Sequence, residues 1–224
     1  MERLYFLPQW FIMYGLGLEL VFAIITFLVA LYAYKVYKLT SQKEHKLFSL
    51  GFLLVSFSYI CWFILNLFAL IELNDNLLTL EIGNAVKLIN LGAYLHILFS
   101  LLGLIFLVYT SLKVKRAGIF VLISSLTIFS ILLTDRKALM FYFLSSILVL
   151  YLVVHYFLEY RKKRNIRLIV MSSAFFFLFL GTFELIFTSR YSADYVVGHI
   201  FILISYLIIL LNLASVFKNG QKKK

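Results

Sequence analysis

Apolar stretches of about twenty residues, separated by short charged segments, recur along the whole chain. A helix needs about 20 apolar residues to cross the roughly 30 Å hydrocarbon core of a bilayer, because it rises about 1.5 Å per residue. Continuous apolar runs favour helices over a barrel, since helices satisfy their own backbone groups in lipid. The sequence therefore predicts an all-α polytopic membrane protein, with residues 1–224 forming a single seven-transmembrane-helix bundle. The predicted spans are 10–34, 47–71, 88–112, 117–134, 138–158, 168–188 and 195–217.

Composition supports this class. The chain is 63% hydrophobic and 14% charged, which leaves too little polar surface to cover a soluble globule of 224 residues. We therefore expect a multi-pass protein of the cell membrane, with the bilayer as its solvent.

Basic residues concentrate on one side of the predicted spans. The positive-inside rule then predicts an N-terminus outside and a C-terminus in the cytoplasm. The net charge of +11 is expected to attract anionic lipid headgroups at the cytoplasmic face, and it needs no nucleic acid to explain it. The opposite side holds Arg3, Lys87, Arg136, Lys137 and Arg190 only. The sixteen basic residues of the cytoplasmic side are Lys35, Lys38, Lys43, Lys46, Lys113, Lys115, Arg116, Arg161, Lys162, Lys163, Arg164, Arg167, Lys218, Lys222, Lys223 and Lys224.

Two features of the sequence suggest an internal repeat. His96 and His199 lie at matching depths in the third and seventh predicted helices, each nineteen residues before a lysine. The loops 38–46 and 159–167 are both nine residues long and basic. Both features fit a 3+1+3 parallel repeat, in which the first three helices recur as the last three around a single linking helix.

Ionisable side chains inside the predicted spans are the main functional signal, because they are costly in lipid and normally have partners. Glu19, His96, Glu184 and His199 lie 16 to 19 residues from cytoplasmic basic residues. At about 1.5 Å per residue, this places all four in one layer, roughly 24 to 29 Å from the cytoplasmic side. Asn66, beside several aromatic residues, is a further candidate for the wall of the same pocket.

Several uses of such a layer stay open. His96, His199, Glu19 and Glu184 together suit zinc or another divalent metal. The two histidines could instead ligate a haem. A carboxyl group and an imidazole could also exchange a proton or bind a ligand. Finally, each polar group could simply hydrogen-bond a neighbouring helix and fix the packing of the bundle.

Catalytic motifs are weak in this sequence. It has no Ser, His and Asp arrangement with a recognisable spacing, no Gly-rich phosphate loop and no pair of histidines on one helical turn. Nucleophilic catalysis therefore has little support, and a role without catalysis is preferred to an enzymatic one.

Two resemblances bear on function. The segments 34–39 (YKVYKL) and 48–52 (FSLGF), followed by Trp62, are similar to prokaryotic seven-helix sensor regions that precede histidine kinases, and to stand-alone archaeal membrane proteins of unknown function. This implies a prokaryotic membrane receptor or accessory subunit whose output passes through a protein partner on the cytoplasmic loops. In length, helix number and N-terminal orientation, the chain also resembles the small sugar-transporter and PQ-loop class, although its only proline is Pro8.

These observations predict an integral membrane sensor or accessory protein with an outward-facing polar cavity. The alternative is a small-solute or proton-coupled transporter. A metal- or haem-binding membrane enzyme is the third hypothesis.

Overall fold

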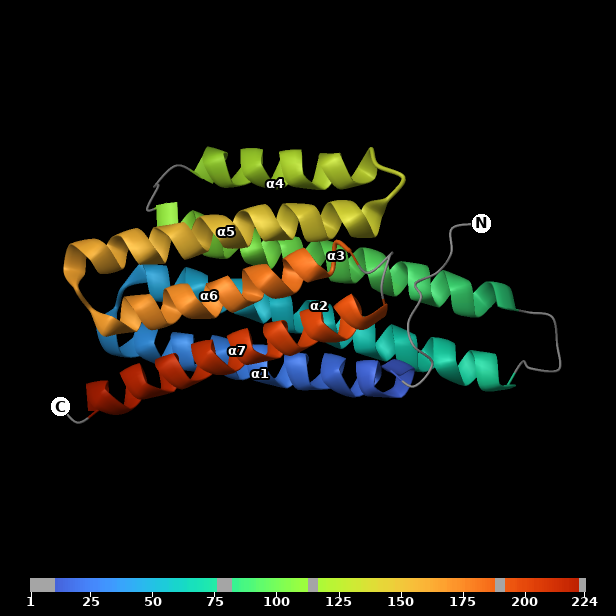
Figure 1. Cartoon of the computed structure of the whole chain (residues 1–224), viewed down its shortest axis with the longest axis horizontal. Helices are drawn as coiled ribbons and strands as arrows, with labels where there is room; N and C mark the ends of the chain where they lie inside the picture. The colour runs from blue at the N-terminus through green and yellow to red at the C-terminus, as the bar shows by residue number, and fades with distance from the viewer. Residues whose placement is uncertain (1–10, 76–81, 113–116, 188–191, 222–224) are drawn as a thin grey trace.

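The computed structural model describes residues 11–75, 82–112, 117–187 and 192–221, and within them it contains seven helices and no strand (Figure 1). Six of the helices in this part of the chain are long and apolar enough to cross a membrane. The prediction of an all-helical multi-pass membrane protein is therefore confirmed. The helices are α1 (Phe11–Thr40), α2 (Lys43–Asp75), α3 (Ile82–Leu112), α4 (Ala117–Leu132), α5 (Lys137–Lys163), α6 (Ile166–Glu184) and α7 (Ser192–Gln221).

The exception among the predicted spans is α4. It has 16 residues, which corresponds to about 24 Å of helix, less than the roughly 30 Å of a hydrocarbon core. Several other helices exceed their predicted spans, because a helix can continue through polar residues beyond the apolar run. For example, α1 continues to Thr40 and α5 to Lys163.

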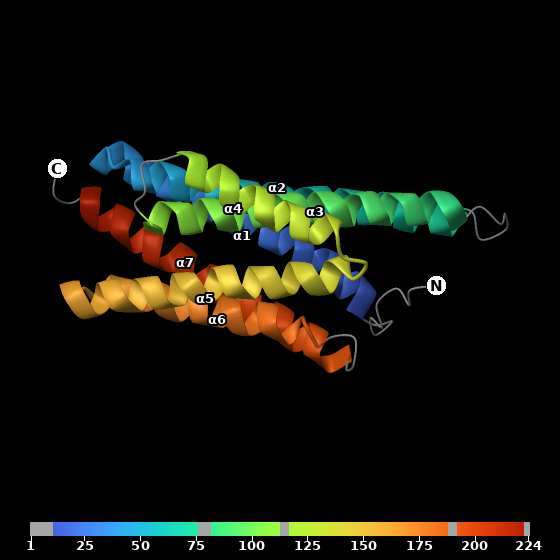
Figure 2. The ribbon, with the colours of Figure 1, turned by 90° about the horizontal axis from the view of Figure 1, so that it is seen from above.

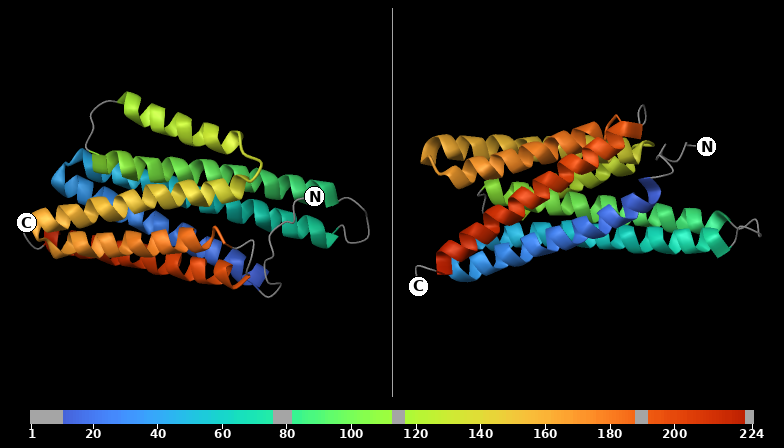
Figure 3. Two further views of the ribbon diagram at one scale, coloured as in Figure 1. Left: turned by 45° about the horizontal axis from the view of Figure 1, so that its top comes forward. Right: turned by 60° about the horizontal axis from the view of Figure 1, so that its bottom comes forward.

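The helices pack as two three-helix units, α1–α3 and α5–α7. Within the first unit α2 contacts both α1 and α3, and within the second α6 contacts both α5 and α7. The units meet where α1 contacts α7 and where α3 contacts α5. Among the described helices, α4 contacts only α3 and α5, and it lies at the edge of the bundle (Figures 2 and 3).

The first connection in each unit is the same kind of turn. Only two residues separate α1 from α2, and only two separate α5 from α6. Ser41 and Arg164, 123 positions apart, both have positive φ, at 56° and 52°. The amide of Ser41 donates to the carbonyl of Tyr37 at 2.7 Å, and the amide of Arg164 donates to that of Tyr160 at 2.8 Å.

A hydrogen bond between helices also recurs at this spacing. Ser49 Oγ on α2 donates to the Ala30 carbonyl on α1 at 2.8 Å. Ser172 Oγ on α6 donates to the Val153 carbonyl on α5 at 3.0 Å. Both donors and both acceptors are 123 positions apart, so the first two helices of each unit pack in the same register.

Glycines lie at close helix approaches in both units. A Cβ atom on Gly103 of α3 would lie 2.7 Å from the carbonyl oxygen of Gly51 on α2. A Cβ atom on Gly181 of α6 would lie 2.7 Å from the carbonyl oxygen of Gly198 on α7. Small residues at membrane helix contacts let backbones come close enough for extensive van der Waals packing, which drives helix association in lipid.

Packed apolar side chains fill the half of the bundle nearest the two turns. Phe52 on α2 is 1% exposed and Phe175 on α6 is 0% exposed, and these residues are also 123 positions apart. Val29, Leu107 and Ile209 belong to the same buried cluster. The opposite half of the bundle contains a cavity.

Candidate functional site

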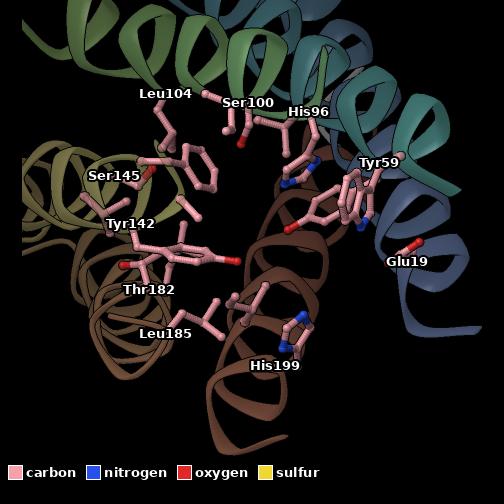
Figure 4. Close-up of a pocket in the computed structure, with 18 of the residues that line it drawn as sticks. Glu19, Tyr59, His96, Ser100, Leu104, Tyr142, Ser145, Thr182, Leu185 and His199 are labelled. Atoms are coloured by element: carbon pink, nitrogen blue, oxygen red, sulfur yellow. The ribbon is translucent and has the colours of Figure 1, made fainter. Parts of the chain in front are cut away.

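A cavity of about 120 Å³ lies between the two units. Its wall includes residues of α1, α2, α3, α5, α6 and α7, and none of α4. Ala138, at the start of α5, and Tyr195, near the start of α7, place it in the half of the bundle where these helices begin. Figure 4 shows the groups that give the wall its polar character, which include Glu19, Tyr59, His96, Tyr142, Ser145 and His199.

Three of the ionisable residues selected from the sequence line this one cavity. They are Glu19 on α1, His96 on α3 and His199 on α7. Asn66 lies on α2 beside the first of them, with its side-chain amide 3.4 Å from both carboxyl oxygens of Glu19. Glu184 is the exception, because the wall includes its neighbour Leu185 instead.

Glu19 is a buried acid with neutral neighbours. Its side chain is 7% exposed, and besides the Asn66 amide it has the Trp62 indole beside it. Within the described ranges, no Lys or Arg side chain forms an ion pair with it. Among the described residues, the groups that would stabilise a negative charge on Glu19 are therefore neutral donors.

His96 lies in an aromatic surround. Its ring centroid is 5.1 Å from that of Tyr59, 5.7 Å from that of Trp62 and 5.6 Å from that of Phe141. Its Nδ1 atom is buried and has no hydrogen-bond partner among the described groups. A buried polar atom of this kind is a position where a bound molecule or water could be held.

His199 is oriented by its own helix. Its Nδ1 atom lies 2.7 Å from the Tyr195 carbonyl oxygen on the preceding turn. Because a carbonyl oxygen only accepts, Nδ1 carries the proton in this bond. The ring also packs on Tyr195, at 4.2 Å between centroids, and stacks on Phe22 at 5.9 Å.

Sequence reasoning missed several polar groups of the wall. Ser145 is 1% exposed, lines the cavity, and its Oγ has no hydrogen-bond partner in the part of the chain that the structure describes. Its neighbour Ser146 does have partners, because it donates to the Tyr142 carbonyl at 2.8 Å and contacts Thr182 Oγ1 on α6 at 3.1 Å. Contacts of this kind pack neighbouring membrane helices.

Tyrosines form a second unexpected part of the site. The Tyr59 hydroxyl on α2 lies 3.3 Å from the Tyr206 hydroxyl on α7, which joins the two units across the cavity. Tyr142, another wall residue, lies 123 positions after Glu19. This spacing is that of the matching turns and serine hydrogen bonds of the structure, whereas the loops 38–46 and 159–167 that suggested a repeat in the sequence are 121 positions apart.

The predicted metal and haem sites do not fit this geometry. Across the described ranges, no group of three or more His, Cys, Asp or Glu side chains could hold a metal ion, so Glu19, His96, Glu184 and His199 do not form one ligand set. Drug-sized ligands occupy pockets of roughly 300–1,000 Å³. A cavity of about 120 Å³ is too small for a haem.

The chain matches no protein-family model, no characterised protein and no solved structure in these three comparisons. A functional proposal for it therefore rests on the cavity and its residues.

Proposed function

We propose that this chain is a carrier for a small solute, and that the cavity between the two three-helix units is its substrate site. The observation that carries this proposal is the wall itself, to which all six helices of the two units contribute and α4 does not. In secondary transporters built from repeats, the substrate lies at the interface between repeats. Movement of one unit against the other would then change access to the site.

A 3+1+3 parallel repeat is part of this proposal. It is supported by the two matching turns and by the matching hydrogen bonds of Ser49 and Ser172, all at a spacing of 123. Helices α1 and α5 run in the same direction, with α4 returning the chain between the units (Figure 1). The two units are then related by an axis along the membrane normal, as in parallel-repeat transporters.

The position of the cavity within the bundle is also consistent with a carrier. The cavity lies toward the ends where α1, α5 and α7 begin, while the buried Phe52 and Phe175 close the opposite half. The concentration of basic residues at that closed end supports a cytoplasmic location for it, against anionic headgroups. The structure would then correspond to the outward-facing state of the carrier in the cell membrane.

The wall favours a small, uncharged solute that forms hydrogen bonds and has a flat face. An apolar cavity of about 150 Å³ binds benzene, so a cavity of about 120 Å³ suits a molecule near that size. His96 and Ser145 offer unpartnered polar atoms, while the rings of Tyr59, Phe141 and Tyr142 offer stacking surfaces. Small neutral heterocycles and small polyols are the classes to test.

The decisive experiment is solute flux in liposomes containing the purified protein. A set of neutral heterocycles and polyols is first ranked by the increase in thermal stability that each causes, and the best are then measured as radiolabelled solutes. Ser145→Phe fills the cavity and should abolish flux. Ser173→Phe changes an exposed serine on α6, outside the wall, and is the matched control that should keep it. Absence of both binding and flux for every solute would reject the carrier.

A sensor or accessory protein is the second candidate. It is favoured by the exposed basic residues at the end of α5 and the turn after it, Arg161, Lys162 and Arg164, which could contact a protein partner. A sensor would bind a solute of the set without transporting it. Co-purification of a partner that is lost when these three residues are changed to Gln would then favour the sensor.

A further inference from the structure

Glu19 has an unusual position even for a buried acid. It lies in the wall of a cavity between membrane helices, 7% exposed, and forms no ion pair with a cation among the described residues. The Asn66 amide is at 3.4 Å, near the upper limit for a hydrogen bond. Such donors compensate a full charge only weakly, and an uncompensated charge inside a membrane protein costs several kcal/mol. Binding of a proton removes that charge and leaves the remaining contacts in place.

The groups that face Glu19 across the cavity can pass or hold a proton, and none is a Lys or Arg. These groups lie on α2, α3, α5 and α7, and they are all of the ionisable side chains in the cavity wall besides Glu19. By helix, these are Tyr59 on α2, His96 on α3, Tyr142 on α5, and Tyr195, His199 and Tyr206 on α7.

The two units differ at this position. The residue 123 positions after Glu19 is Tyr142, which also lines the cavity. A tyrosine hydroxyl is neutral near pH 7, whereas a carboxyl group can be either charged or neutral there, depending on its surroundings. At this position, proton binding near pH 7 would thus change the charge of the wall residue on α1, which is Glu19, and not that of Tyr142 on α5.

We propose that Glu19 is the proton-binding site of the cavity, and that loading and release of one proton there is coupled to transport of the solute. The coupling rests on the carrier proposed above, but the protonation of Glu19 does not. The solute and the proton would bind in the same cavity. Glu19 would then be neutral while the solute is bound.

The test is labelling with dicyclohexylcarbodiimide, a lipid-soluble reagent that reacts with protonated carboxyl groups. The carboxyl oxygen bonds to the central carbon of the reagent, and the carboxyl proton moves to one of its nitrogens. The adduct then rearranges to a stable N-acylurea without any further reactant. Peptide mass spectrometry of the detergent-solubilised full chain, treated over a range of pH, identifies the labelled residue.

We expect one label at Glu19 that decreases as the pH rises. Glu19→Gln should remove the label, and Glu19→Asp should retain it, which separates loss of the acid from loss of the fold. Glu184→Gln, outside the wall, should leave the labelling of Glu19 unchanged. No label at Glu19 at any pH, or a label that does not respond to pH, would overturn the proposal.

The experiments distinguish a failure of the proton site at Glu19 from a failure of the carrier. Solute flux without labelling of Glu19 overturns the proton site and leaves the carrier intact. Labelling without flux supports the proton site and overturns the coupling. If both are found, solute movement should change the internal pH reported by pyranine trapped in the liposomes, and a flux that leaves pyranine unchanged contradicts coupling.

Discussion

Replacement of Gly103 by alanine tests the close approach of α2 and α3. The new Cβ atom would lie 2.7 Å from the Gly51 carbonyl oxygen and 2.7 Å from a methyl group of Val55, whereas ordinary contact begins at 3.4 Å. The oxygen belongs to a helical backbone, so the helices themselves must separate. We therefore expect a lower free energy of unfolding.

The magnitude is the balance of two terms. Overpacking of a close contact costs about 1–3 kcal/mol, and a rigid backbone neighbour places this change near the upper end. Replacing Gly by Ala within a helix returns up to about 1 kcal/mol. The expected net loss is about 2 kcal/mol, which lowers the melting temperature of a domain of this size by about 4–8 °C.

Gly17→Ala is the matched control, because a Cβ atom there has nothing within 4 Å. It should gain the helical contribution without the clash, so its stability should equal or exceed that of the wild type. Equilibrium unfolding in mixed micelles, followed by circular dichroism, measures both variants. Equal stability of Gly103→Ala and Gly17→Ala would refute the close contact.

Three further predictions concern packing and orientation. Ser49→Ala and Ser172→Ala should each lower the free energy of unfolding by about 0.6 kcal/mol, with additive effects in the double variant; clearly unequal losses would contradict the matching roles of these bonds. Phe175→Ala should cost about 3 kcal/mol by the same unfolding assay, because the ring is fully buried, and a loss below about 1 kcal/mol would contradict its place in the closed half. In a Cys61→Ser background, Ser41→Cys should react with a membrane-impermeant maleimide in inside-out vesicles but not in intact cells. The reverse result would place the turn outside.

The apolar runs in the sequence predicted the positions of the seven described helices, of which six are long and apolar enough to cross a membrane, but not where the helices end. The basic segment 38–46 was predicted as a nine-residue loop, whereas α1 continues to Thr40 and α2 begins at Lys43. Lysine and glutamate are good helix formers, so charged residues can extend a helix beyond the lipid core. Hydropathy indicates which residues lie in the bilayer, but it does not locate the turn. The turn lies where the backbone of Ser41 adopts a left-handed conformation.

Position along the helices could be predicted for the site residues from the sequence, and direction around the helix could not. Glu19, His96 and His199 were expected in one layer and do line one cavity. Glu184 was expected with them, but the wall includes Leu185. With 3.6 residues per turn, neighbouring residues differ by about 100° in direction, so a correct depth does not specify which of the two faces the cavity.

The cavity wall contains no residue of α4. All of its residues fall in two continuous segments of the chain, 19–104 and 138–206. Two shorter polypeptides, divided on either side of α4, would together carry every group of the wall. In the composition of its cavity wall, the chain is therefore equivalent to a heterodimer of two three-helix proteins that α4 and its flanking segments join covalently.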